Sequence, residues 1–155
     1  MKRIGSIIGA AMLLFALSAC SGKTPPQPEG LMGKKLLTSI RALEHSYEKR
    51  DLGGFMGNVL PSAANRGEWE RSIKTVFAKY DQIHFSFHNT KMLVMMPDRG
   101  NIKASVNWDA EWSTTSGEQV KDSGRVTLVF DPKDLLLADI EGKNPFVPAV
   151  TPVKQ

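Results

Sequence analysis

The sequence predicts an α+β domain in which three N-terminal helices pack on a curved antiparallel sheet of about four strands. Up to Tyr80 the apolar residues recur with the period of a helix, and after Tyr80 they alternate with polar residues, as in a strand. Helices therefore come first and strands after them. This order favours helices on one face of an antiparallel sheet, because parallel sheets need alternating strands and helices.

Three segments have the apolar spacing of helices. The first covers about residues 31–50. Asp51 can cap a second helix that continues to about residue 60, where Pro61 ends it, and the third covers about residues 66–80. Their apolar faces consist of Leu36, Leu37, Ile40, Leu43 and Tyr47 in the first, Leu52, Phe55, Met56 and Val59 in the second, and Trp69, Ile73, Val76, Phe77 and Tyr80 in the third.

The strands follow from period-two alternation. The longest such pattern covers residues 102–113, where apolar residues from Ile102 to Trp112 alternate with polar ones. Its one apolar face indicates a sheet that is covered by helices on one side and faces water on the other. Further strand segments are expected at residues 83–88, 92–96, 126–130 and 135–140, with turns at residues 97–100 and 116–117.

The N-terminus has the pattern of an export signal. Lys2 and Arg3 precede an apolar run of about a dozen residues, and Leu17-Ser18-Ala19 leads directly to Cys20. The run is shorter than the ~18–20 residues that cross a bilayer as a helix. This segment resembles the signal peptide of bacterial lipoproteins, which implies removal of residues 1–19, attachment of diacylglycerol to the thiol of Cys20, and acylation of the new N-terminus, with palmitate for example.

The same resemblance implies a location. Ser21 after the cysteine, in place of Asp, favours the outer membrane of a Gram-negative cell, with the domain facing the periplasm. In a Gram-positive host the protein would be anchored to the outer side of the cell membrane. Several acyl chains give stable anchoring, whereas a single chain is marginal.

Composition excludes several classes of site. Cys20 is the only cysteine, so a modified Cys20 leaves no thiol for a disulfide, a nucleophile or a metal. Loss of Lys2 and Arg3 takes the formal charge of the chain from +4 to +2, which gives no support for nucleic-acid binding. The sequence also lacks a phosphate-binding glycine loop and the common hydrolase motifs, and no cofactor is expected.

The chain is expected to form one domain with flexible ends. Residues 20–30 are polar and rich in Pro and Gly, as in a tether, and residues 31–146 form the domain. Residues 147–155 form a C-terminal tail with no periodicity, and Phe146 is the last residue expected to be ordered.

The order of these segments is itself informative. The end of the first helix, Ala42 to Arg50, is followed by Asp51-Leu52-Gly53-Gly54-Phe55-Met56, then by a helix with Trp69 and Phe77, and finally by strands that end at Ile140-Glu141-Gly142. This order resembles the nuclear-transport-factor-2-like superfamily, which implies a cone-shaped α+β fold from about Leu36 to Phe146. Enzymes of that superfamily, such as ketosteroid isomerase, usually carry a small hairpin before the third helix. Because none is evident, the chain is more similar to the cell-envelope members without known catalysis.

Polar side chains on the strands offer two candidate sites. His84 and His88 share a strand face, but a metal site would need His45 or a distant carboxylate as a third ligand, so we expect no metal. Asp109 and Glu111 could act as an acid and base pair if they were enclosed. A solvated sheet face explains all four residues without such chemistry.

Two residues of the helices are further acid or base candidates. The superfamily's enzymes place such groups at the mouth of the cone, where Tyr47 and Asp51 would lie by this resemblance. Asp51 is equally explained as a helix cap, and Tyr47 as part of the apolar face of the first helix. We therefore expect no catalytic residue.

The aromatic residues suggest either a filled core or an apolar pocket. If the cone stays open, a small or lipid-like apolar ligand would contact aromatic side chains and Met95, with Met92 and Met96 nearby. The residues expected to line it are Trp69, Phe77, Phe85, Met95, Trp108 and Phe130.

Three functions remain open at this stage. The first is a non-enzymatic lipoprotein that binds a small ligand, a second copy of itself or another envelope protein. The alternative is an isomerase-like or dehydratase-like enzyme with an acid or base in the cone, and the third is a passive structural component. The fold alone does not distinguish them.

Overall fold

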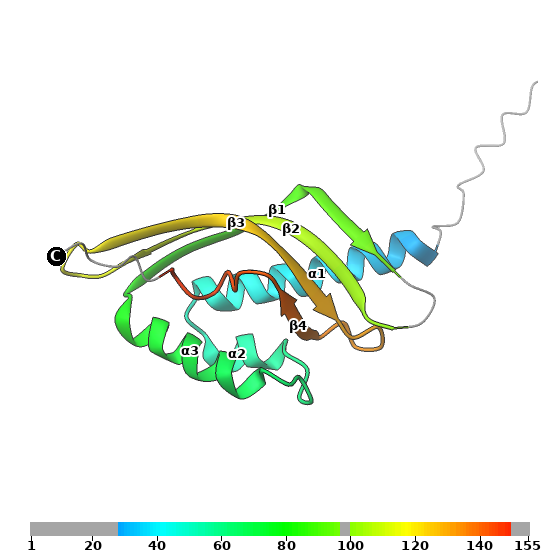
Figure 1. Ribbon diagram of the computed structural model, residues 1–155, viewed down its shortest axis with the longest axis horizontal. Coiled ribbons are helices and arrows are strands. Elements are labelled where there is room, and N and C mark those ends of the chain that lie inside the picture. The colour runs from blue at the N-terminus through cyan, green and yellow to red at the C-terminus, as the bar shows by residue number, and fades with distance from the viewer. Residues whose placement is uncertain (1–27, 97–99, 150–155) are drawn as a thin grey trace, which may run out of the picture.

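A computed structural model describes residues 28–96 and 100–149 of the chain. Helices α1 (Pro28–Glu48), α2 (Leu52–Gly57) and α3 (Arg66–Lys79) come first, followed by strands β1 (Gln82–Met95), β2 (Ile102–Ser113), β3 (Gln119–Phe130) and β4 (Leu137–Glu141). The four strands form one antiparallel sheet in the order β1-β2-β3-β4. The predicted α+β class and strand number are confirmed. Figure 1 shows the helices on the concave side of the curved sheet.

Some predicted segments lie outside the described residues. These are the signal peptide 1–19 with Cys20, most of the tether (20–27), the turn residues 97–99 and the tail from residue 150 onward. No helix within residues 28–96 and 100–149 is long and apolar enough to cross a membrane.

The ends of the first two helices differ from the prediction. Helix α1 begins at Pro28, three residues before the expected start, because proline suits the first turn of a helix, where its missing N–H is not needed. Helix α2 ends at Gly57, before the expected residue 60. The chain leaves the helix there because Asn58 and Leu60 exchange hydrogen bonds with the backbone of Leu137, in a parallel bridge between Val59 and Leu137.

Strand β1 covers both apolar segments that the sequence indicated, residues 83–88 and all but the last residue of 92–96. Its pairing with β2 shifts register between His88 and Leu93, so an irregularity interrupts the alternation without ending the strand. Strand β3 is also longer than expected, because it begins at Gln119 and not near residue 126. Residues 119–125 hold a single large apolar side chain, Val120, so alternation could not reveal this half, and backbone pairing with β2 defines it.

The alternating strand 102–113 behaves as predicted. Its even-numbered residues from Ile102 to Trp112 are buried against the helices, and its odd-numbered residues lie on the outer face of the sheet. The neighbouring strands have the same division into a buried and an outer face, because strand pairing places Phe85 opposite Ala110 and Leu128 opposite Ala104. The core therefore fills the space between the concave face of the sheet and the three helices.

Helix α1 also covers part of the edge of the sheet that β1 forms. The carboxylates of Glu48 and Glu44, one helical turn apart, accept hydrogen bonds from the backbone N–H groups of Phe85 and Phe87, both at 3.1 Å. Unpaired N–H groups on an edge strand would otherwise invite pairing with another chain. Burial raises the pKa of Glu44, partly offset by the hydrogen bond from Phe87.

Candidate functional site

The interior of the domain is filled by a side chain from the segment that follows β4. Phe146 is buried, and its ring lies 4.8 Å from that of Phe55, 5.0 Å from that of Tyr47 and 5.2 Å from that of Phe85, between ring centroids. These are the spacings of rings in contact. The space between the sheet and the helices is therefore filled by packed side chains around Phe146.

The hydroxyl of Tyr47 fixes this packing. It donates a hydrogen bond to the backbone oxygen of Phe146 at 2.7 Å and accepts one from Nε1 of Trp112 at 2.8 Å. Burial raises the pKa of Tyr47 well above its ordinary value, with the Trp112 hydrogen bond acting in the opposite direction. Tyr47 is thus a neutral phenol with both hydrogen-bonding directions used, which is unsuited to proton transfer.

The segment 142–149 runs from β4 beneath the sheet toward α3, as Figure 1 shows. Asp122 on β3 holds it: its Oδ2 lies 2.5 Å from Nζ of Lys143 and 3.4 Å from the backbone nitrogen of Ala149. Farther along, Val147 and Pro148 are half-buried and border a shallow hollow of about 290 Å³ beside Val76 of α3. We call residues 142–149 the closing segment, because they cover the interior from this side.

The residues predicted to line an apolar pocket are only partly brought together. Trp69, Phe77, Phe85, Trp108 and Phe130 are buried in the core. Met95 lies elsewhere, half-exposed on the outer face of the sheet opposite Lys103. The hollows beside Glu111, Met95, Val76 and Glu48 are lined by other residues and not by Tyr47, Phe85 or Phe146.

One buried polar atom has no partner. Nε1 of Trp108 is the only buried side-chain nitrogen or oxygen among the described residues that makes no hydrogen bond. The indole packs against Gly124 on β3, where a Cβ would come within 3.4 Å of Nε1, and the Lys143 ammonium lies 5.6 Å from its ring. The indole of Trp108 therefore lies over Gly124, its cross-strand partner.

Asp51 takes the role of helix cap. Its Oδ1 accepts a hydrogen bond from the backbone nitrogen of Gly54 at 2.9 Å, and the residue is exposed. This agrees with the capping interpretation and places the carboxylate away from the interior. Neither residue named as an acid or base of the cone is therefore free to act inside it.

The outer face of the sheet carries the other candidates. His88 pairs with Asp109, and Glu111 pairs with Lys121 at 2.9 Å, so the two carboxylates have different partners and do not form an acid and base pair. Within residues 28–96 and 100–149 no group of three His, Cys, Asp or Glu could hold a metal ion. His84 and His88 are both exposed on the outer face of the sheet.

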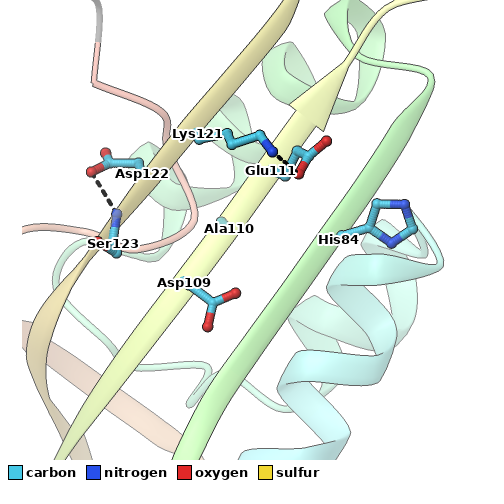
Figure 2. A pocket seen from close by; sticks show the side chains of 7 residues that line it. All are labelled: His84, Asp109, Ala110, Glu111, Lys121, Asp122 and Ser123. Atoms are coloured by element: carbon cyan, nitrogen blue, oxygen red, sulfur yellow. Dashed lines mark hydrogen bonds and ion pairs between the residues drawn. The ribbon is translucent and has the colours of Figure 1, made fainter.

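This face has a broad, open hollow of about 430 Å³ (Figure 2). Polar and charged side chains from three strands surround it, and Lys121 reaches across to Glu111. The sequence alternation indicated the face, but only strand pairing brings these residues together. The lining residues are His84, Asp109, Ala110, Glu111, Lys121, Asp122 and Ser123.

Comparison with solved structures shows what this architecture is. A nuclear transport factor 2 (NTF2-like) superfamily protein from Salmonella enterica superimposes with a TM-score of 0.62 at 10% identity, over 76% of this chain and 93% of the other. The chain has the NTF2-like fold. No protein-family model matches this chain, and no curated protein matches its sequence.

Other NTF2-like structures resemble the domain to a similar degree. A putative dehydratase of the NTF2-like family from Streptomyces avermitilis gives a TM-score of 0.57 at 17% identity, covering 71% of this chain and 93% of that one. The BvnE pinacolase from Penicillium brevicompactum gives 0.56 at 13% identity, covering 70% and 84%. At these identities the likeness concerns the fold. The short connection between α2 and α3 here, residues 58–65, holds no hairpin, as the sequence predicted.

Proposed function

We propose that this protein is a membrane-anchored lipoprotein of the cell envelope, whose NTF2-like domain is a non-enzymatic module that binds a partner protein. One observation carries the non-enzymatic part: Phe146 fills the interior in which an NTF2-like enzyme would hold a substrate, and the Tyr47 hydroxyl hydrogen-bonds to its backbone. The anchor is Cys20, and the expected location is the outer membrane, facing the periplasm.

The partner surface in this proposal is the outer face of the sheet. A small molecule is usually held in a concave, mostly apolar site that buries most of it. The hollow beside Glu111 and Lys121 is instead open and charged, which suits the polar parts of a protein interface. A second copy of the chain is one such partner, and another envelope protein is the other.

Site-specific photo-crosslinking tests the partner surface. A photoreactive amino acid would replace Arg125, an exposed residue on the outer face of β3, in cells that make the full chain. Lys74, an exposed residue of α3, provides the matched control. A crosslinked adduct from position 125 and none from position 74 is expected. Adducts at position 74 alone would move the interface to the helices and contradict the proposal.

The anchor is tested separately by mass spectrometry of the membrane fraction. A mature N-terminus at Cys20 with diacylglycerol and an acyl chain is expected, and Cys20→Ala should leave the chain unprocessed and unmodified. A wild-type chain that keeps residues 1–19 would refute the lipoprotein assignment.

One observation favours a second candidate, a small-molecule site of the isomerase or dehydratase type inside the cone. The buried Nε1 of Trp108 lacks an acceptor, which costs about 1–3 kcal/mol, and a ligand oxygen could satisfy it if the closing segment moved away. Native mass spectrometry of the protein purified from cells distinguishes the two. We expect an empty chain; a retained small molecule that is lost in Trp108→Phe would favour the second candidate.

A further inference from the structure

Leaving aside residues 89–92, the exposed large apolar side chains of the described residues are Leu31, Leu93, Met95 and Met96. Their exposed fractions range from 39% for Met96 to 59% for Leu93. Leu31 belongs to the first turn of α1, Leu93 and Met95 lie at the end of β1, and Met96 directly follows that strand. We call these four residues the apolar tip.

The contacts between α1 and β1 place both parts of the tip at one end of the domain. Glu48 bonds to Phe85 and Glu44 to Phe87, so the helix runs antiparallel to the strand. From Glu48 back to Leu31 the helix spans about 26 Å, which β1 covers in about eight residues beyond Phe85. Leu31 is therefore level with Leu93. In Figure 1 the start of α1 and the end of β1 lie at the same end of the molecule.

The tip side chains on β1 point away from the core. Leu93 and Met95 lie opposite Ser105 and Lys103, which belong to the outer face of the sheet. Met95 and Met96 border an open hollow of about 420 Å³ with Asn101 and Lys103. These apolar groups are thus available to a surface outside the domain.

The chain connection identifies that surface. Cys20 precedes Pro28 by only eight residues, which span at most about 28 Å when fully extended. A lipid on Cys20 would therefore keep the start of α1, and with it the apolar tip, close to the membrane. The β2–β3 turn at Ser116 lies at the opposite end of the long strands.

The charges near the tip fit the same surface. Lys34 and Lys35, three and four residues after Leu31, are exposed in the second turn of α1. Lysines beside a bilayer are attracted to anionic lipid headgroups. Exposed apolar side chains with adjacent lysines are typical of surfaces that enter the headgroup region of a bilayer.

We propose that the apolar tip contacts the lipid surface of the membrane that holds Cys20, so that the domain has a fixed orientation on it. This inference rests on the lipid anchor of the proposed function. The domain would stand on the α1 and β1 end, with the β2–β3 turn and the charged part of the outer face, near Glu111 and Lys121, held away from the bilayer and free for a partner.

Fluorescence quenching by lipids tests this orientation. Because Cys20 is the only cysteine and its thiol is occupied by lipid, an introduced cysteine can be labelled selectively in the full-length mature lipoprotein. Met95→Cys carries an environment-sensitive dye at the tip, and Ser116→Cys carries it at the opposite end. Each protein is reconstituted into vesicles of phosphatidylethanolamine and phosphatidylglycerol that contain a phospholipid with a headgroup spin label.

The expected result is a blue-shifted emission at position 95 and quenching several-fold stronger than at position 116. Replacing Lys34 and Lys35 with Glu should reduce this difference in vesicles with phosphatidylglycerol. Equal, weak quenching at both positions would overturn the proposal. A blue shift at position 95 without quenching by lipid would also overturn it, and would assign the tip to a second copy of the chain or another protein.

Failure of the anchor is recognised by a different signal. Flotation with the vesicles reports attachment, whereas quenching reports the position of the tip. For a chain that does not float, a hexahistidine sequence inserted after Cys20 and a nickel-chelating lipid provide the attachment at the same point. Strong quenching at position 95 in that sample supports contact between tip and lipid even without native lipidation, and weak quenching there refutes it.

Discussion

The hydroxyl of Tyr47 lies 2.7 Å from the backbone oxygen of Phe146, to which it donates a hydrogen bond. The two residues are 99 positions apart, on α1 and on the closing segment. The ring of Phe146 lies against that of Tyr47, so one contact both fills the interior and holds the segment in place.

Phe146→Ala should destabilise the domain by about 3–5 kcal/mol, because the buried ring leaves a cavity among Tyr47, Phe55 and Phe85. Urea denaturation measures this loss. Val147→Ala, at the half-buried next position, is the matched control and should cost about 1 kcal/mol or less. Equal losses for both variants would show that Phe146 does not fill the core.

Tyr47→Phe should cost about 1–3 kcal/mol, because it leaves the buried oxygen of Phe146 and the N–H of Trp112 without partners. A double-mutant cycle with Trp112→Phe isolates the hydrogen bond between the two side chains. The double variant should lose less stability than the two single losses combined. Strict additivity would mean that the Trp112 hydrogen bond contributes nothing.

Glu44→Gln should remove a pH dependence of stability. Burial raises the folded-state pKa of Glu44 above its ordinary value of 4.5, so the folded protein holds this proton more tightly than the unfolded chain. The stability that Glu44 contributes to the folded protein is therefore fully present below the ordinary pKa of the group, and it decreases as the pH rises through the raised pKa of the folded state. The glutamine can still accept the hydrogen bond from Phe87.

Urea midpoints measured from pH 4 to pH 7 test this prediction. The decline of the urea midpoint with rising pH that Glu44 causes should disappear in Glu44→Gln. It should persist in Glu70→Gln, at an exposed position of α3. A wild-type slope that survives in Glu44→Gln would assign the dependence to another group.

Asp122→Asn should loosen the closing segment. Burial acts to raise the pKa of Asp122. The hydrogen bonds from Lys143, Ser123 and Ala149 outweigh this effect and hold the pKa below its ordinary value of 3.8. The stability that Asp122 contributes is therefore present above its ordinary pKa and is lost as the pH falls through the pKa of the folded state. Hydrogen exchange in residues 142–149 should become faster in the variant at neutral pH, since an amide cannot form the ion pair with Lys143.

A charge swap provides the control for Asp122. Lys143→Asp alone should also speed exchange in the closing segment, and Asp122→Lys combined with Lys143→Asp should restore part of the protection. Unchanged exchange in both single variants would show that Phe146 and Tyr47 hold the segment without help from the ion pair.

Residues whose roles depend on near neighbours in the chain were predicted correctly. The helical spacing of Leu36, Ile40, Leu43 and Tyr47 placed all four in the core, and the alternation from Ile102 to Trp112 identified the buried and outer faces of β2. Asp51 as a helix cap also follows from local sequence. Burial patterns of this kind repeat over a few residues, so they are visible without knowledge of the fold.

The sequence by itself therefore determined the α+β order, the helices and the face of β2, whereas the lipid anchor at Cys20 stays a prediction from the sequence. Only the tertiary structure decided whether the cone is open. Phe146 belongs to a segment without periodicity, and its burial depends on Tyr47 and Phe55, about 90 to 100 positions earlier in the chain. The separation of Met95 from the core aromatics has the same cause, because the register shift after His88 and the pairing with Lys103 turn it outward. Such long-range packing depends on which strands and helices meet, and local sequence patterns do not contain that information.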